Sequence, residues 1–193
     1  MKRQAILLFT AMAAASLLLI ARSSPADART VDAASCPLNS GASQIVLQNK
    51  MYAESFTPTH SGKITRGFIE TFNTMEKPAP YVVEIWNADA SGVPTGSAAL
   101  SSTVVNHPHY GYDFGYPIFS APAKVIAGQN YALVVTVVEP SINGVVTDRD
   151  DPCSGTFSLD QTGSGTFAAD ASNRDMVFLL TETLRRHHRH HRR

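Results

Sequence analysis

The stretch HYGYDFGY, residues 109–116, alternates aromatic residues with small or polar ones. The aromatic residues are Tyr110, Tyr112, Phe114 and Tyr116. Because side chains alternate between the two faces of a β-strand, this period of two predicts a strand with four rings on one face. Glycine and aspartate on the opposite face resemble an outer surface, so we expect Tyr112 and Phe114 to lie in the core. Tyr110 and Tyr116, at the two ends of the run, are the rings that we expect to be exposed.

The chain between residues 44 and 184 carries strand signals throughout. Short runs of Val, Ile, Thr, Tyr and Phe are separated by clusters of Gly, Pro, Asn, Asp and Ser. The expected strands are Gln44–Gln48, Ala53–Phe56, Lys63–Phe72, Tyr81–Asn87, Leu100–Val105, Tyr110–Phe114, Tyr131–Val138, Gly144–Thr147, Gly155–Leu159, Gly165–Ala168 and Met176–Thr183. Turn signals at this spacing predict one antiparallel all-β domain, either a sandwich or a barrel.

The N-terminal residues 1–28 have the order of a secretory signal peptide. Two basic residues precede the apolar run Ala5–Ala21, and Ala26 and Ala28 supply a small-residue cleavage site. We therefore expect cleavage after Ala28 and a secreted protein, extracellular or periplasmic. Because the apolar run is long for a signal peptide, an uncleaved membrane anchor is the alternative.

Two cysteines, Cys36 and Cys153, are present in the chain. In an exported protein an even, small number of cysteines predicts a disulfide, here one that ties an N-terminal extension (29–43) to the last third of the domain. Two separately used thiols are the alternative. Two isolated cysteines without a C-x-x-C pair do not indicate a zinc site.

The charge is distributed unevenly along the chain. Residues 29–184 hold eight Lys or Arg residues against fifteen Asp or Glu residues, whereas RRHHRHHRR, residues 185–193, holds five arginines and four histidines. We expect the tail Arg185 to Arg193 to be disordered, because it has no apolar residue. It could bind anionic polymers in a salt-sensitive manner. The alternative is a solubilising tail that contacts the acidic body.

Three stretches resemble a known class of module. They are AESFTPTHSGKITRGFIETF (53–72), VEIWNADASGVPTGSAAL (83–100) and FSAPAKVIAGQNYALVV (119–135). In this order they resemble the uncharacterised jelly-roll-like β-sandwich modules of exported bacterial proteins, which often accompany cell-surface anchoring or carbohydrate-active parts. The resemblance covers roughly residues 44–183 and implies a jelly-roll-like sandwich without a known catalytic set. The His/Arg-rich tail departs from the pattern of these modules.

Exposed aromatic rings suggest a carbohydrate ligand. In VVEIWNAD, residues 82–89, Glu84 and Trp86 share one strand face, which we expect to be the outer one. A tryptophan beside a carboxylate suits sugar recognition, and an ordinary half-covered surface is the alternative. Together with Tyr110 and Tyr116 these residues form the predicted ligand-binding set.

An acidic turn offers a candidate metal site. The stretch TDRDDPCSG, residues 147–155, places the hard oxygen ligands of Asp148, Asp150 and Asp151 close together, as calcium requires. A solvated acidic loop without metal is the alternative. No other cofactor is predicted.

The sequence gives no indication of catalysis. It contains no G-x-S-x-G, H-E-x-x-H or phosphate-loop motif. We therefore expect a secreted, non-catalytic module that binds extracellular or cell-surface carbohydrate. The alternatives are a structural or adhesive surface protein, held to anionic polymers by its cationic tail, and a small hydrolase that uses Glu70, Glu84 or Glu139.

Overall fold

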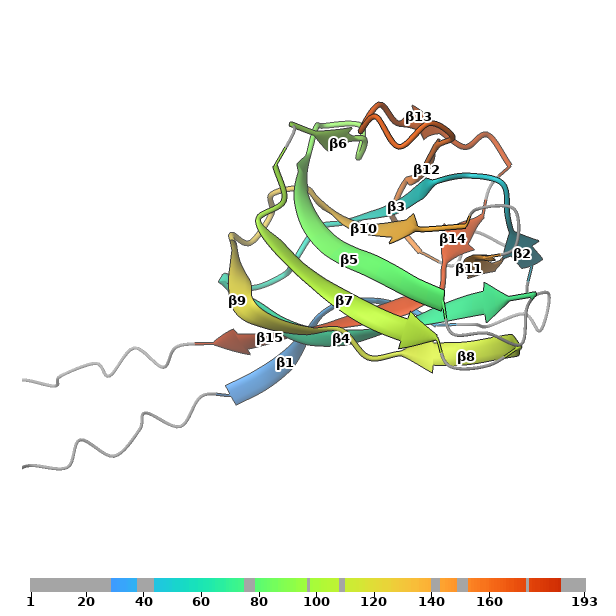
Figure 1. Ribbon diagram of the computed structural model, residues 1–193. Coiled ribbons are helices and arrows are strands. Elements are labelled where there is room, and N and C mark those ends of the chain that lie inside the picture. Colours follow the sequence, from blue (N-terminus) through green and yellow to red (C-terminus); the bar gives the residue numbers. More distant parts are fainter. Residues whose placement is uncertain are drawn as a thin grey trace, which may run out of the picture.

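A computed structural model describes residues 29–37, 44–74, 79–96, 98–107, 110–139, 143–148, 153–172 and 174–184. These residues form β-strands, turns and irregular segments, and the strands lie in two antiparallel sheets that face each other (Figure 1). The all-β, two-sheet prediction is confirmed, whereas the jelly-roll order of the strands stays a prediction. In the part of the chain described, no helix is long and apolar enough to cross a membrane. The predicted signal peptide and cationic tail lie outside it.

The first sheet has eight strands and is organised around the long strand β4. Its strands are β1 (Arg29–Cys36), β2 (Gln44–Val46), β4 (Gly62–Asn73), β8 (Gly111–Gly115), β9 (Ile118–Val125), β11 (Asn143–Asp148), β14 (Asp175–Met176) and β15 (Phe178–Leu184). The order β1-β15-β4-β11-β14 forms its main path. The strands β8 and β9 pair with β4, and β2 pairs with β11.

The second sheet has seven strands and is centred on β10. Its strands are β3 (Met51–Phe56), β5 (Ala79–Ala88), β6 (Pro94–Thr95), β7 (Ser101–His107), β10 (Tyr131–Val137), β12 (Phe157–Asp160) and β13 (Ala168–Ala169). The order is β13-β12-β3-β10-β5-β6, with β7 paired along β5. The central position of β10 explains its near-continuous apolar sequence, YALVVTV, because both of its faces are covered.

The main core fills the space between the sheets. Alternate residues of the central strands point into it, including Leu133 and Val135 on β10, Ile69 on β4 and Leu180 on β15. All four are fully buried, and each such burial contributes roughly 1.5–3 kcal/mol of hydrophobic free energy to folding. A smaller cluster covers the outer face of the seven-stranded sheet around Trp86.

Three strands, β1, β6 and β9, were not expected from the sequence. The strand β1, which was expected to be part of an extension before the sandwich, pairs with β15 from Arg29 opposite Leu184 to Cys36 opposite Phe178. The strand β9 contains Pro122 and lacks alternation. In β9 the pairing with β4 is interrupted between its residues 118 and 123, so the missing proline N–H is not needed by the β4 ladder.

The predicted disulfide is present. Cys36, at the end of β1, is bonded to Cys153, which precedes β12, and their Cα atoms lie 5.6 Å apart. The bond therefore joins an edge strand of the eight-stranded sheet to the segment that leads into the seven-stranded sheet.

Candidate functional site

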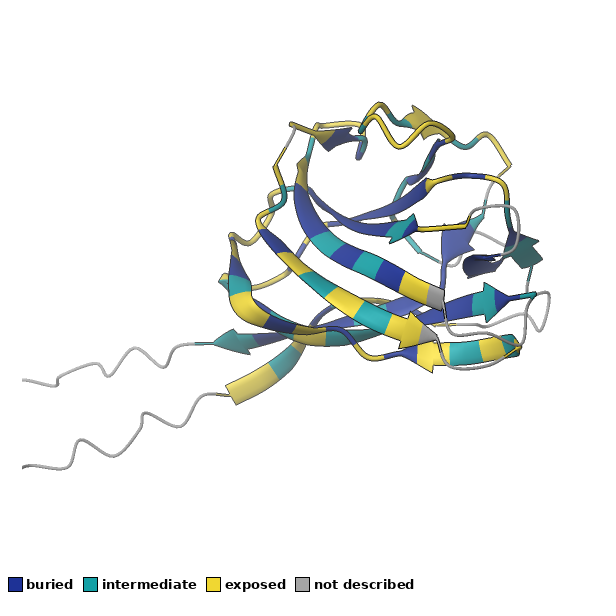
Figure 2. Cartoon of the chain, viewed as in Figure 1, coloured by how far each residue is buried: buried dark blue, intermediate teal, exposed yellow. Residues whose placement is uncertain are grey.

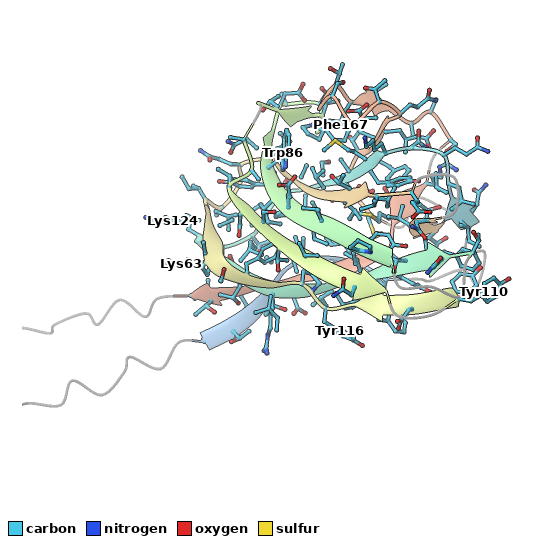
Figure 3. The ribbon with its side chains drawn as sticks, viewed as in Figure 1. Lys63, Trp86, Tyr110, Tyr116, Lys124 and Phe167 are labelled. Atoms are coloured by element: carbon cyan, nitrogen blue, oxygen red, sulfur yellow. A yellow bond between two sulfur atoms is a disulfide. The ribbon has the colours of Figure 1, made fainter. Side chains whose placement is uncertain are left out.

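The four aromatic rings of residues 110–116 all lie on the outer face of the eight-stranded sheet. Their exposed fractions are 62% for Tyr110, 54% for Tyr112, 50% for Phe114 and 67% for Tyr116. Figure 2 shows the alternation of exposed and more covered residues along β8. In Figure 3 the Tyr116 side chain points away from the sandwich. The expectation that Tyr112 and Phe114 lie in the core is wrong.

At Gly115 the inward face of β8 is glycine because another strand lies close to it. A Cβ atom added to Gly115 would lie 2.9 Å from Cγ1 of Val105 on β7 and 3.1 Å from Cγ1 of Ile69 on β4. Larger side chains would not fit at this position. The face that carries the glycines was expected to be exposed to solvent, whereas at Gly115 it packs against Val105 and Ile69.

Two phenylalanines of β4 support the exposed rings. Phe72 lies directly opposite Tyr112, with ring centroids 4.9 Å apart and ring planes at 71°, and it also meets Tyr110 at 6.2 Å. Phe68 meets Phe114 edge-to-face at 5.8 Å. Edge-to-face contacts are favourable and restrict the rings. We call this surface the aromatic face; it consists of Phe68, Phe72, Tyr110, Tyr112, Phe114 and Tyr116.

A carboxyl group lies within the aromatic face. Glu70 stands on β4 between Phe68 and Phe72, opposite Phe114, and is only 9% exposed. Burial raises the pKa of Glu70 above its ordinary value, because the charged form loses hydration. The carboxyl group therefore holds its proton to higher pH than an exposed glutamate and, when protonated, can donate a hydrogen bond.

Trp86 lies on the other sheet and is covered. It shares the outer face of β5 with Glu84, as predicted, and its indole Nε1 donates a hydrogen bond to Glu84 Oε2 at 3.1 Å. However, Trp86 is only 6% exposed, because Phe167 packs edge-on against it with a centroid distance of 6.2 Å. Figure 3 shows the two rings together, away from Tyr110 and Tyr116. The four predicted ligand-binding residues therefore do not form one surface.

The cover over Trp86 is a loop organised by Asp160. Its Oδ1 accepts hydrogen bonds from the backbone N–H groups of Thr162 (2.8 Å) and Gly163 (3.0 Å), and its Oδ2 accepts one from Gly165 (2.7 Å). Desolvation alone would raise the pKa of Asp160, but the hydrogen bonds from Thr162, Gly165 and Gly163 outweigh it and hold the pKa below its ordinary value. The ionised carboxylate thus fixes the loop, which the turn-rich stretch DQTGSG (160–165) could have suggested.

The structure describes the candidate calcium site only in part. Asp148 is buried on β11 opposite Asp175 of β14, while Asp150 and Asp151 lie outside the described residues. Asp175 Oδ2 accepts a hydrogen bond from the Cys153 N–H at 3.1 Å and lies close to both disulfide sulfurs. Disulfide sulfurs are not thiolates and do not form a metal centre with Asp175. The calcium site at residues 148–151 stays a prediction.

Of the three candidate glutamates, Glu70 and Glu84 do not face each other. Glu70 lies on the outer face of the eight-stranded sheet and Glu84 on the outer face of the seven-stranded sheet, with the core between them. Glycoside hydrolysis requires two carboxyl groups roughly 5–9.5 Å apart on either side of one bond. Glu70 and Glu84 do not meet this requirement, and Glu139 is exposed after the end of β10.

A search with protein-family models finds no match to the chain, and a search of curated proteins finds none either. The geometry of the described residues is therefore the basis for a functional inference. Contiguous exposed apolar surface is uncommon on soluble proteins and marks sites of interaction. The aromatic face is such a surface, and it is the candidate site.

Proposed function

We propose that the protein is a secreted, non-catalytic module that binds carbohydrate through the aromatic face. The observation that carries this proposal is the row of rings from Tyr110 to Tyr116, each at least half exposed and all on one side of the sheet. Same-face residues of a strand are about 6.8 Å apart, so the row offers successive flat apolar surfaces along one direction. An extended chain of sugar rings presents a matching series of flat apolar faces.

The support of the rings favours binding over accidental exposure. Phe68 and Phe72 contact three of the four exposed rings and hold them before any ligand arrives. A surface that is already ordered loses less conformational entropy on binding. The tyrosine hydroxyl groups at the outer edge add hydrogen-bonding capacity beside the apolar ring faces.

Trp86 and Glu84 are left out of the proposed site. The indole is covered by the 160–167 loop, and its N–H already has a partner in Glu84. The disulfide between Cys36 and Cys153 supports the exported location in the proposal, because such bonds persist in oxidising compartments.

The test is a binding assay with purified protein on plant, bacterial and chitin-like polysaccharides. The parent protein is compared with the Tyr110→Ala/Tyr116→Ala double variant and with Val138→Ala, which removes an exposed apolar side chain at the end of β10. Thermal melts first establish that each variant is folded. We expect binding by the parent and by Val138→Ala, and a loss of about tenfold or more in affinity for the double variant.

Three results would contradict the proposal. One is the absence of binding by the parent protein across the polysaccharides. Another is binding that the Tyr110→Ala/Tyr116→Ala variant keeps in full. The third is a concentration-dependent dimer that the double variant no longer forms, because the aromatic face would then be an interface between two copies. Light scattering at several protein concentrations distinguishes this case.

A further inference from the structure

The outer face of β4 continues from the aromatic face into a group of cationic side chains. Lys63 lies near the start of β4, directly opposite Lys124 of β9, and Figure 3 shows both residues at one end of the molecule. Their neighbours in register, Ile64 and Ala123, are buried in the core, so the two lysines point outward. Ile64 and Ala123 belong to the same core as Ile69, and the pairing register of β4 shifts between Ile64 and Arg66. The lysines therefore lie on the same side of the sheet as the rings.

Arg66 connects the two regions. It is exposed on the outer face of β4, opposite Ile118 of β9, and it is two residues from Phe68. At about 3.4 Å per residue, the distance along β4 from Arg66 to Phe68 is about 7 Å, and the whole run from Lys63 to Phe72 is about 30 Å. We call Lys63, Arg66 and Lys124 the cationic end.

The placement of these charges is unfavourable without an anionic partner. Lys63 and Lys124 are like charges directly opposite each other in a β-ladder, an arrangement that destabilises a sheet. Within the described residues, neither of them nor Arg66 forms an ion pair with a carboxylate. Asp32 is the acidic residue that the register places beside Arg66, and it is two strands away, or about 10 Å.

The segregation of charge adds to this argument. Residues 29–184 contain eight basic and fifteen acidic side chains, yet three of the basic ones gather on one end of one sheet face. The described chain also ends here, because Thr183 lies opposite Lys63. The sequence continues from Leu184 with the cationic residues RRHHRHHRR.

The surface at the cationic end is hollowed. Lys63 and Lys124 line a pocket of about 600 Å³ together with Ser61, Ile126 and Thr183. This volume lies within the usual range of ligand sites, about 300–1,000 Å³. Two ammonium groups, two hydroxyl groups and an exposed isoleucine suit an anionic group carried on a partly apolar ring.

We propose that the ligand is an anionic polysaccharide. It lies along β4 and β8 with its sugar rings on the aromatic face and its carboxylate, sulfate or phosphate groups at the cationic end. The inference rests on the proposed function, since it names the class of glycan for the same surface. Single-stranded nucleic acid also combines stacking with negative charge. The disulfide favours the polysaccharide, because such bonds persist in oxidising, extracellular compartments.

The experiment uses polymers that differ only in charge. The full chain is titrated with two pairs of charged and neutral polymers, polygalacturonate with its methyl ester and dextran sulfate with dextran, at low and high salt. Single-stranded oligodeoxythymidine is titrated under the same conditions to test nucleic acid as the ligand. The parent is compared with Lys63→Gln/Arg66→Gln/Lys124→Gln, with the single variant Lys124→Gln, and with Lys50→Gln as a control. Lys50 is exposed and precedes β3 of the other sheet. Tyr110→Ala/Tyr116→Ala is measured in parallel.

We expect the parent to bind the charged member of at least one pair about tenfold or more tightly than the neutral member, with a preference that shrinks as salt rises. The triple variant should lose this preference and keep its affinity for the neutral member. Lys124→Gln should lose part of the preference, and Lys50→Gln should keep it. Because Lys124 is exposed, we expect Lys124→Gln to fold, so it can test the proposal even if the triple variant does not fold.

Different failures separate the two proposals. Equal affinity of the parent for charged and neutral members, or a triple variant that keeps the charge preference, would overturn the anionic ligand and leave the aromatic face as a glycan site. Charged binding that survives Tyr110→Ala/Tyr116→Ala would overturn the proposed function, and the present inference with it. Tighter binding of oligodeoxythymidine than of either charged polysaccharide would assign the surface to nucleic acid. Absence of binding to every polymer would overturn both proposals.

Discussion

Phe72 of β4 and Tyr112 of β8 are paired directly across the sheet, and their ring centroids lie 4.9 Å apart with the planes at 71°. The exposed ring of Tyr112 therefore packs against the half-buried ring of Phe72. The relationship explains how a sheet can carry exposed rings at fixed positions. It also makes a quantitative prediction about the stability of the aromatic face.

We expect Phe72 and Tyr112 to be energetically coupled. A double-mutant cycle of Phe72→Ala and Tyr112→Ala, measured by chemical denaturation, should give a coupling free energy of about 0.5–1.5 kcal/mol. The control cycle combines Phe72→Ala with Val138→Ala, which follows β10 in the other sheet, and should be additive within about 0.5 kcal/mol. Coupling no larger than in the control cycle would mean that the ring contact does not stabilise the face.

The close packing on the inner side of β8 predicts a strict size limit at Gly115. An added methyl group would meet Val105 Cγ1 at 2.9 Å, so Gly115→Ala should lower the free energy of unfolding by about 1–3 kcal/mol. Val105→Ala opens space on the opposing strand. The double variant Gly115→Ala/Val105→Ala should therefore be more stable than the sum of the two single effects predicts. Strict additivity would show that the β7 contact is not what excludes a side chain.

The strands themselves were largely predictable from the sequence, because their signals are local. Alternation and turn residues place β4, β5 and β10 within a few residues of their bounds, and the even number of cysteines predicts the disulfide correctly. The strand β9 was not predicted, since Pro122 and the absence of alternation are typical of a loop. Its place in the sheet depends on pairing with β4, which is far away in sequence.

Which face of each strand points into the core was less predictable, because it depends on what packs against each face. The pattern of β8 allows either face to be inside, and only the close approach of Val105 to Gly115 decides between them. Trp86 has the sequence context of an exposed residue. Its cover comes from Phe167, eighty-one positions later, and no signal within β5 reveals it. Tyr112 and Phe114, expected in the core, are therefore exposed, whereas Trp86 lies on the expected outer face but is covered.

Loss of the disulfide should destabilise the domain strongly. Cys36 and Cys153 are 117 positions apart, so the bond closes a loop of more than half of the chain in the unfolded state. For a loop of this length the entropic model gives about 4–5 kcal/mol. We expect Cys36→Ser/Cys153→Ser to show a large fall in melting temperature and the parent to show a similar fall after reduction. A double variant as stable as the parent would mean that β1 and β15 hold the N-terminal segment without the bond.

The single tryptophan gives a direct readout of the Asp160 loop. Because the ionised carboxylate holds three backbone N–H groups, Asp160→Ala should release the loop and expose Trp86. We expect a red-shifted emission maximum and stronger quenching by acrylamide. The pKa of Asp160 is lowered in the folded protein, so its contribution is present above the ordinary carboxyl range and is lost as the pH falls through the folded pKa. The parent should therefore approach the emission of the variant in acid.

Asp32→Ala is the matched control for this experiment. Asp32 is an exposed aspartate on β1 of the other sheet, away from the 160–167 loop. At every pH, the Trp86 emission of Asp32→Ala should equal that of the parent. Unchanged fluorescence in Asp160→Ala as well would show that Phe167 covers the indole without help from the turn.

A buried carboxylate at the other end of the sandwich should give the opposite dependence on pH. Glu182 of β15 is fully buried, and neither of its carboxylate oxygens has a hydrogen-bond partner among the described residues. The imidazole of His60 lies close to it, with 3.8 Å between Nδ1 and Oε1. Burial raises the pKa of Glu182, and His60 offsets this only in part.

The raised pKa means that the folded protein binds the Glu182 proton more tightly than the unfolded chain does. The stabilising effect of the protonated form is complete below the ordinary carboxyl pKa and is lost as the pH rises through the folded pKa. Glu182→Gln keeps the shape and removes the charge, so it should stabilise the protein at pH 7 by about 1 kcal/mol or more and change little at pH 4. Melting temperatures of parent and variant from pH 4 to pH 8 measure this difference, with Asp32→Asn as the exposed control. A difference between parent and variant that stays constant across this range would show that Glu182 keeps an ordinary pKa in the folded protein.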